Sequence, residues 1–551
     1  MSASSKKQLH KEQKAAKMTE RQLQEQKEAK KLKIMTAGFT AVLALILVVA
    51  LVFSVTQFIT NSGIREKNTV AAVIGDTELS NAQLNYYYVD AVNEFLRTYG
   101  SYAAMFGLDL TKPLDEQIVN EETGATWADD FTSSALSNAQ ATYALANAAK
   151  AAGFALTEEE QAAIDNSISQ MELSAVMSGY TSAKDYVKAY YGQGASLESF
   201  REYIEMNQLA QAYYNKYATD LTYDDAALRE AEAGKEAEFS NFSYNYYYLN
   251  TSKFLEGGTT AEDGTVTYSE EEKAAAAKAA EEAAKALAEM EITSVEEFDA
   301  AIAALTINAG AETAPTSTAC LDYAYANVTS AAREWITDAK RTAGELGYVK
   351  NASTTTAEDG TETETINGYY VVYFIGSNNN KFPLANVRHI LVTEGGKYDA
   401  TTGQTTYTEE ELAAAKEKAE KILAMYEAGN HTEEAFKTLA LEHNTDPGSK
   451  ENGGLYEDVY PGQMVETFND WCFAEGRKPG DTGIVVSDFG AHIMYYVSHS
   501  TTIYRDMLIE NTLRSEDTAA WYEALIEATT VTENNTKYLS RDLVLSSNVA
   551  Y

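Results

Sequence analysis

Alternation of apolar and polar residues marks two short stretches in the last third of the chain as strands. Residues 386–392 read N-V-R-H-I-L-V and residues 490–493 read G-A-H-I, so each places one histidine in an apolar run. This period is typical of a β-strand that turns one polar side chain toward an inner face. The sequence between them predicts two helices, followed by turns and a shorter third helix.

Helical periodicity dominates the first half of the chain after residue 80. Residues 70–75 predict a short strand, and Ser80 is the expected N-cap of the helix that follows. Further helices are expected to begin at Thr157, which opens a capping box with Glu160, and at Ser196. Residues 504–528 are also helical in pattern, and the Trp521-Tyr522 pair is a candidate anchor for that helix, although ordinary packing explains it equally well.

An uncharged apolar run covers residues 34–59 and is long enough to cross roughly 30 Å of hydrocarbon as a helix. Residues 1–33 are rich in lysine, which by the positive-inside rule predicts a cytoplasmic N-terminus and an extracytoplasmic remainder. A cleavable signal peptide is the alternative. The long basic region and the lack of an A-x-A site at the end of the run favour a retained signal anchor.

An internal repeat covers most of the second half. G-x-x-x-Y-x-E-E-E occurs at residues 264–272 and again at 403–411, and Trp335 and Arg341 correspond to Trp471 and Arg477 at an offset of 136 residues. The stretch 368–373 likewise corresponds to 490–495. A repeat of this length indicates two tandem domains of one architecture.

The composition argues against several classes of function and of site. The net charge of −39 argues against nucleic acid as a partner, because phosphate binding requires a basic face. Two cysteines, Cys320 and Cys472, do not form a disulfide framework and are expected to be buried thiols, with a single disulfide as the alternative. No cluster of His, Cys and Asp has metal-ligand spacing, so neither a metal nor a cofactor is expected.

The order of motifs over residues 382–499 resembles the parvulin family of peptidyl-prolyl isomerases. These motifs are V-R-H-I-L-V, two helices ending in a D-x-G-S turn, G-G, G-Q-M-x-x-x-F and G-x-H-I. The resemblance implies a four-stranded antiparallel sheet with helices and a site without cofactor. The residues that match the family's catalytic positions are His389, Asp446, His492 and Ser487, and those that match its substrate-binding positions are Met464, Phe468 and Gln463.

Simpler explanations exist for these residues. A lone strand histidine is often a core residue, and Met464 and Phe468 are also compatible with plain core packing. Two departures from the family are Ala491, where a bulky residue is usual, and Leu455-Tyr456-Glu457 in place of D-L-G. We expect either to affect the rim of the pocket.

The first copy lacks these residues. Our sequence alignment pairs His389 with Tyr247, His492 with Tyr370, Met464 with Val328, and Phe468 with Ala332. We therefore expect the first copy to keep the fold without the activity. The stretch 377–381 reads as a linker that gives the two copies some freedom.

The region before the repeats resembles the N-terminal chaperone segment of PrsA- and SurA-type foldases, in which a C-terminal helix packs back on that segment. The expected fold is α+β, with a helical chaperone domain, two tandem parvulin-like domains and one preceding transmembrane helix. The expected boundaries are 1–33 for a cytoplasmic basic arm, 34–60 for the anchor, 65–238 for the helical domain, 239–377 for the degenerate copy, 382–500 for the catalytic copy and 503–551 for a C-terminal helix and tail.

Two functions follow from the sequence. One is a membrane-anchored, extracytoplasmic prolyl isomerase acting on unfolded exported proteins with X-Pro bonds. The other is a non-catalytic holdase that uses the parvulin folds as binding modules and grips unfolded clients with its N-terminal segment and first repeat. The tyrosine-rich composition supports this hypothesis, although packing explains the tyrosines as well.

Overall fold

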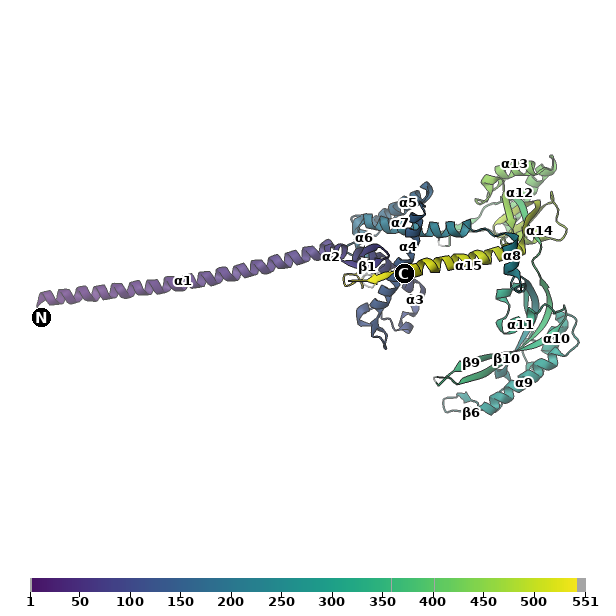
Figure 1. Cartoon of the computed structure of the whole chain (residues 1–551), viewed down its shortest axis with the longest axis horizontal. Coiled ribbons are helices and arrows are strands. Elements are labelled where there is room, and N and C mark those ends of the chain that lie inside the picture. The colour runs from purple at the N-terminus through teal and green to yellow at the C-terminus, as the bar shows by residue number, and fades with distance from the viewer. Residues whose placement is uncertain (1, 358, 401, 543–551) are drawn as a thin grey trace. The chain divides into compact units, whose positions relative to one another are not determined.

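The computed structural model describes residues 2–357, 359–400 and 402–542, without the side chains of residues 15–23 and 26. The chain divides into two compact units, one formed by Met1–Leu221 with Glu516–Tyr551 and the other by Thr222–Ser515. Figure 1 labels the helices and some of the strands of both. The predicted α+β class is confirmed, with antiparallel sheets throughout.

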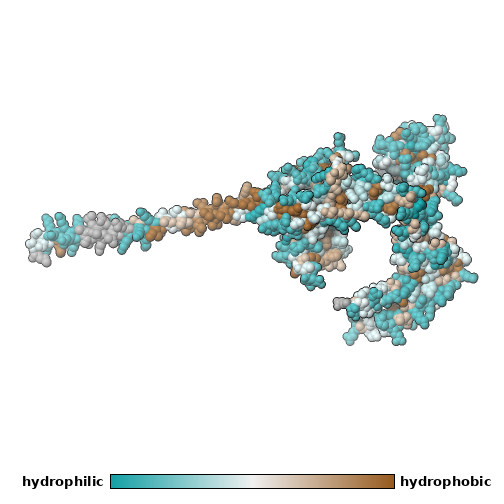
Figure 2. Space-filling model, in the orientation of Figure 1, coloured by the Kyte–Doolittle hydropathy of each residue, from teal (hydrophilic) through white to brown (hydrophobic). Residues whose placement is uncertain are grey.

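The first unit starts with one long helix that contains both the basic and the apolar segment of the predicted anchor. Its described apolar side chains from Leu32 to Phe58 are largely exposed, and Figure 2 shows them as a brown stretch along α1. By length and composition this helix is able to span a membrane. The N-terminal part of the first unit contains α1 (Ala3–Ser62), α2 (Ile64–Asn68), β1 (Val70–Ile74), β2 (Thr77–Ser80), α3 (Asn81–Tyr99), β3 (Ile118–Asn120), β4 (Ala125–Thr126), α4 (Trp127–Ala151), α5 (Glu158–Met177), α6 (Ala183–Tyr191) and α7 (Leu197–Asp220).

The predicted helix starts are confirmed as capping boxes. Ser80, Thr157 and Ser196 each accept a hydrogen bond from the backbone N–H three residues on. The side chain of that later residue accepts one in turn from the backbone N–H of the capping residue. Each box satisfies two amide groups that a helix end otherwise leaves unpaired. The segment 77–80 before the helix forms strand β2, which pairs with β1.

The C-terminal segment packs on this helical unit, as the resemblance implied. Helix α15 (Tyr504–Ala528) brings Trp521 onto Tyr217 with ring centroids 3.8 Å apart and places Tyr522 in the same apolar cluster. Beyond it, β17 (Val531–Glu533) pairs with β1, which the sequence did not predict. Strands from both ends of the chain thus complete one sheet.

The second unit contains both repeats, preceded by α8 (Asp225–Glu232). The first repeat comprises β5 (Asn241–Asn250), β6 (Thr259–Thr260), β7 (Val266–Thr267), α9 (Glu270–Ala288), α10 (Val295–Ala303), β8 (Thr318–Ala324), α11 (Arg333–Ile336), β9 (Leu346–Thr356) and β10 (Glu362–Asn378). The second comprises β11 (Pro383–Val392), β12 (Lys397–Asp399), β13 (Gln404–Thr406), α12 (Glu409–Glu427), α13 (Glu433–His443), β14 (Leu455–Val459), α14 (Glu466–Phe473), β15 (Thr482–Ser487) and β16 (Gly490–Ile503).

Each repeat contains its own four-stranded sheet, and the two sheets have the same topology. Strand order is β8-β5-β10-β9 in the first and β14-β11-β16-β15 in the second, all antiparallel. In each, two helices pack on one face of the sheet and a short helix on the other. Cys320 and Cys472 belong to different repeats and are buried free thiols.

The stretch between the repeats is not the loose connection expected from its sequence. Asn380 is 1% exposed, and its side-chain amide donates to the Phe239 carbonyl at 3.1 Å. The Arg505 guanidinium, also 1% exposed, donates to the Asn379 carbonyl at 2.9 Å and pairs with buried Glu232. A buried charge remains stable only with such partners, so these groups hold the linker in place.

Candidate functional site

The two strand histidines of the second repeat lie side by side. His389 is on β11 and His492 on β16, the central strands of the sheet, and cross-strand register pairs His389 with Met494 and Leu391 with His492. Their Nδ1 atoms are 3.2 Å apart, and the side chains are 3% and 5% exposed. Strand alternation turns both toward the same face, as the sequence predicted.

The Asp-Pro-Gly-Ser turn brings a carboxylate and a hydroxyl to the first histidine. The Nε2 atom of His389 lies 2.9 Å from Asp446 Oδ2 and 3.0 Å from Ser449 Oγ. The turn stays close to β11 because Gly454, with φ +76°, donates its N–H to the Ser449 carbonyl and accepts from His389 N. A Cβ atom at Gly454 would lie 2.1 Å from the His389 carbonyl oxygen, so this approach requires glycine.

The second histidine extends the network to Ser487, whose Oγ is 2.7 Å from His492 Nε2. One arrangement of protons satisfies the contacts of the rings with each other, with Asp446 and with Ser487. His389 Nε2–H donates to Asp446, His492 Nδ1–H donates to His389 Nδ1, and the Ser487 hydroxyl donates to His492 Nε2. The four predicted catalytic-position residues therefore form one continuous hydrogen-bonded chain.

The pKa shifts at the site favour an ionised Asp446 and a neutral His492. The hydrogen bond from His389 is the main cause that holds the pKa of Asp446 well below its usual range, so the carboxylate is ionised at neutral pH. Burial, helped by the neighbouring His389, lowers the pKa of His492 to about 4. His492 is accordingly neutral at pH 7.

An aromatic wall stands against the histidines. Phe468, 2% exposed on α14, presents its ring edge-on to His389 and His492 with centroids 5.3 and 5.7 Å away. Met464, which precedes α14 in the chain, packs in the same cluster. Gln463 is exposed, and its side-chain oxygen accepts from Tyr460 N at 3.1 Å instead of contacting the network.

Three members of the site were missed by sequence reasoning. The sequence predicted Ser449 only as part of a turn. In the structure, the Asn444 side-chain amide donates to Ser449 Oγ at 3.1 Å. The Tyr456 hydroxyl donates to Asp446 Oδ2 at 3.0 Å. Tyr456 belongs to the stretch noted as a departure from the family, and that departure could have pointed to it.

Ala491 does not affect the rim of the pocket, contrary to expectation. It is fully buried in the cluster beneath α12 and α13, on the sheet face opposite His492. Neighbouring strand residues point to opposite faces, so the residue beside a site histidine belongs to the other core.

The register of the first repeat corrects our alignment by one residue. There Tyr246 pairs with Val372 and Tyr248 with Tyr370, as His389 pairs with Met494 and Leu391 with His492. The counterpart of His389 is therefore Tyr246, whereas Tyr247 points to the other face and donates to Asn308 at 3.0 Å. Tyr370 remains the counterpart of His492, and the Tyr246 and Tyr370 rings meet at 5.4 Å.

These tyrosines fill the first repeat's equivalent of the pocket. Both pack against the cluster containing Val328 and Ala332, the smaller residues that stand in place of Met464 and Phe468. The volume gained by the tyrosines offsets the volume lost on the facing wall, which keeps the interior close-packed. In this position the described residues provide neither imidazole nor carboxylate.

Comparison with known proteins agrees with the site. Residues 369–498 match the family described as PPIC-type PPIASE domain. Foldase protein PrsA 1 of Listeria monocytogenes serotype 4b (strain F2365) is 34% identical over 110 residues, covering 20% of this chain and 34% of that protein. PrsA 1 of Listeria innocua is 29% identical over 161 residues, covering 29% and 43%. The chain thus spans less than half the length of these relatives.

Solved structures of the same kind align over parts of the chain. The peptidylprolyl isomerase PrsA of Bacillus anthracis is 23% identical, covering 27% of this chain and 59% of that one, with a TM-score of 0.18. A SurA-like chaperone of Campylobacter jejuni is 24% identical, covering 28% and 57%, with a TM-score of 0.16. The family match and the curated relatives show that the second repeat contains a parvulin-type PPIase domain homologous to PrsA foldases.

Proposed function

Because the second repeat is a parvulin-type PPIase domain, we propose that this chain is a membrane-anchored, extracytoplasmic prolyl isomerase that assists the folding of exported proteins. Rotation about a peptide bond faces a barrier of roughly 18–20 kcal/mol. At X-Pro bonds the isomers are close in energy but exchange in roughly tens to hundreds of seconds. A catalyst for this step needs a pocket for the proline ring and a polar surround for the twisted amide.

The residues of the second repeat supply both parts. Phe468 and Met464 provide the apolar wall on which the proline ring packs, and they exclude water that would stabilise the planar carbonyl. The network of Asp446, His389, His492 and Ser487 provides fixed donors and acceptors along one side. Ionised Asp446 holds the tautomer of His389, so the network is preorganised.

The observation that carries this proposal is the paired-histidine network facing Phe468. The test is NMR exchange of a short X-Pro peptide with the full chain in lipid nanodiscs, beside His389→Ala and the matched first-repeat change Tyr246→Ala. We expect accelerated exchange that His389→Ala reduces and Tyr246→Ala leaves in place. Exchange at the uncatalysed rate with folded wild-type protein would refute the isomerase.

We further propose that α1 anchors the chain with its N-terminus in the cytoplasm and residues after 65 outside. The support is the charge asymmetry: lysines precede the apolar run, while the remainder is strongly acidic. Protease treatment of intact cells tests it. Digestion of the two units with survival of an N-terminal tag is expected, and loss of the tag with both units protected would reverse the topology.

A holdase is the second candidate, and a cavity in the helical unit favours it. That cavity is lined by both apolar and charged residues and lies in a unit that contains no part of the histidine network. The His389→Ala variant separates the two functions. If it suppresses the aggregation of an unfolded client as well as the wild type does, holding does not depend on isomerisation.

A further inference from the structure

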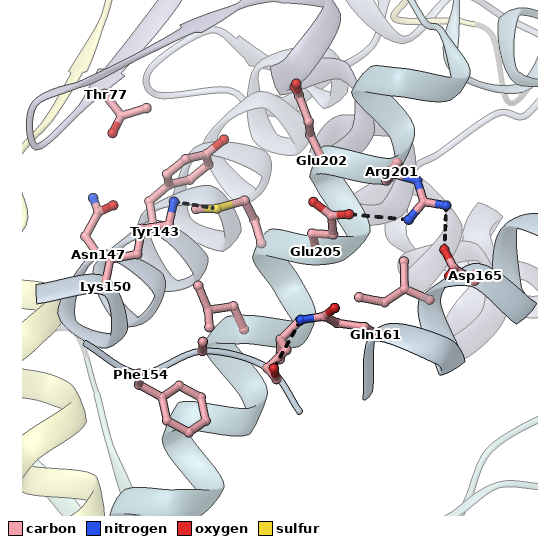
Figure 3. Close-up of a pocket in the computed structure, with 15 residues that line it drawn as sticks. Thr77, Tyr143, Asn147, Lys150, Phe154, Gln161, Asp165, Arg201, Glu202 and Glu205 are labelled. Carbon is pink, nitrogen blue, oxygen red and sulfur yellow. Dashed lines mark hydrogen bonds and ion pairs between the residues drawn. The ribbon is translucent and has the colours of Figure 1, made fainter. Parts of the chain in front are cut away.

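A cavity of about 730 Å³ opens in the helical unit between α4, α5 and α7 (Figure 3). The loop that joins α4 to α5 closes one end, and Thr77 of β2 lies at another side. This volume is in the range of sites that enclose a small ligand or a few residues of a peptide. All of its lining residues belong to the first unit.

The floor of the cavity is apolar. Ile164 of α5 and Leu209 of α7 are 3% and 9% exposed, and Phe154, Leu156 and Met206 line the wall beside them. Such a surface fits a large apolar side chain, because its burial removes apolar area from water. Methionine adapts its shape to different partners, so the wall tolerates more than one side chain.

The rim of the cavity has more negative than positive groups. Arg201 pairs with Asp165 at 2.7 Å and with Glu205 at 3.5 Å, so one cation is shared by two carboxylates. Glu202 adds a third carboxylate, which has no ion-pair partner among the described residues. Figure 3 shows Glu202 on the same helix as Arg201 and Glu205, whereas Asp165 comes from α5.

The opposite side of the rim offers a hydrogen-bond donor. The Lys150 ammonium contacts the Met206 sulfur at 3.2 Å and has no carboxylate within ion-pair distance among the described residues. An ammonium carries three donors, and a thioether sulfur is a weak acceptor for only one of them. Lys150 is thus available to a carbonyl oxygen of a bound backbone.

We propose that this cavity binds an extended peptide segment in which a large apolar residue stands next to a lysine or arginine. The apolar side chain enters the floor, the basic side chain pairs with Glu202, and a backbone carbonyl accepts from Lys150. The charge of −39 on the chain draws basic segments toward it. This inference rests on the proposed function in one respect, since it takes unfolded proteins as the partners.

Helix α5, which forms one wall of the cavity, has few buried residues. Of the twenty residues of α5, only Ile164 and Ala175 are buried. A helix with so little buried apolar surface shifts at low cost in free energy. The cavity therefore adapts to segments of different size, as a binding site for varied clients requires.

The test uses fluorescent nine-residue probes without proline and the full chain in nanodiscs. The parent probe carries one leucine followed by one lysine in a glycine-serine background, and matched probes replace leucine by serine or lysine by glutamine. Fluorescence anisotropy gives the affinities. We expect each replacement to weaken binding by about fivefold or more, from a contribution of about 1 kcal/mol per contact.

The protein variants are Glu202→Lys and, as a matched control, Glu198→Lys, which makes the same charge change at an exposed position of α7 outside the lining. We expect the first to weaken binding of the parent probe about fivefold and the second less than twofold. Equal losses in both variants, or equal affinity for all probes, would overturn the proposal. Because the probes contain no proline, neither result depends on the isomerase.

Discussion

The two repeats differ in their pockets while keeping the same supporting contacts. In each, an arginine stacks over a tryptophan and donates to its carbonyl at 2.9 Å, Arg341 with Trp335 and Arg477 with Trp471. In each, a carboxylate in the first helix accepts from a glycine N–H of the preceding hairpin, at 2.9 Å in the first repeat and 3.0 Å in the second. The contacts that build the fold are thus duplicated.

The two repeats differ on the sheet face that carries the histidines in the second repeat. The second repeat places two imidazoles and a carboxylate beneath a phenylalanine, and the first places two tyrosines beneath an alanine. A buried polar network costs free energy unless every member is satisfied. Aromatic packing closes the sheet of the first repeat without such a network. The comparison therefore shows that this sheet can be closed without the histidine network, which fits the role in the reaction that we propose for it.

The largest expected effect comes from the aromatic wall. Phe468→Ala removes a side chain that is 2% exposed, and we expect it to destabilise the second repeat by about 3–5 kcal/mol. The mirror change Ala332→Phe overfills the first repeat and costs about 1–3 kcal/mol there. Fluorine NMR of chains labelled with fluorotryptophan would follow Trp471 and Trp335 separately during denaturation. Equal losses from both changes would mean that the two pockets are packed alike.

The next effect concerns the reaction. His389→Ala interrupts the chain between Asp446 and His492, and we expect X-Pro exchange to slow by about 100-fold, the scale of a positioned polar group. The mirror change Tyr246→Ala should leave the rate within about twofold. NMR exchange on the full chain measures both. A first-repeat variant that slows exchange as strongly would show that the repeats share the activity.

Lowering the pH from 7 to 5 should reduce the free energy of unfolding of the second repeat by about 2 kcal/mol more than that of the first. The pKa of His492 is lowered from 6.5 to about 4, so between these values the unfolded chain binds a proton that the folded repeat does not. This stabilisation is complete above about pH 6.5 and falls as the pH drops toward 4, at about 1.4 kcal/mol per unit. Denaturation at pH 7 and pH 5 should therefore show a larger loss for the Trp471 signal than for the Trp335 signal. His492→Gln should abolish that difference.

The smallest effect should be equal in both repeats. Arg341→Gln and Arg477→Gln each remove a guanidinium from a tryptophan face about 4 Å away, and we expect each to cost about 1 kcal/mol in its own repeat. The same fluorine signals report the losses. A cost in only one repeat would show that the shared contacts have diverged in strength as well.

Sequence reasoning predicted the fold well because local signals agree with it. Capping boxes at Ser80, Thr157 and Ser196 and the alternation around His389 and His492 fix elements without knowledge of distant partners. It failed where a contact depends on register or on folding at long range. Tyr247 and Tyr246 are both aromatic, and only cross-strand pairing shows which faces the pocket.

The site was predicted in part for the same reason. His389, Asp446, His492 and Ser487 stand in motifs with strong spacing, and the structure brings them together. Tyr456 reaches Asp446 only because β14 lies beside β11 in the sheet. The departure from the family at residues 455–457 marks Tyr456 as unusual, but only the strand pairing shows that Asp446 is its partner.

The pairing of β1 with β17 has a consequence for biogenesis. Ala72 and Glu533 are strand neighbours although the entire second unit lies between them in sequence. A chain synthesised from its N-terminus presents Ala72 long before Glu533, and long-range strand pairing is slow to form. The repeats are therefore able to fold as an internal insert while the helical unit waits for its last strand. The segment made first is thus the last to reach its final structure.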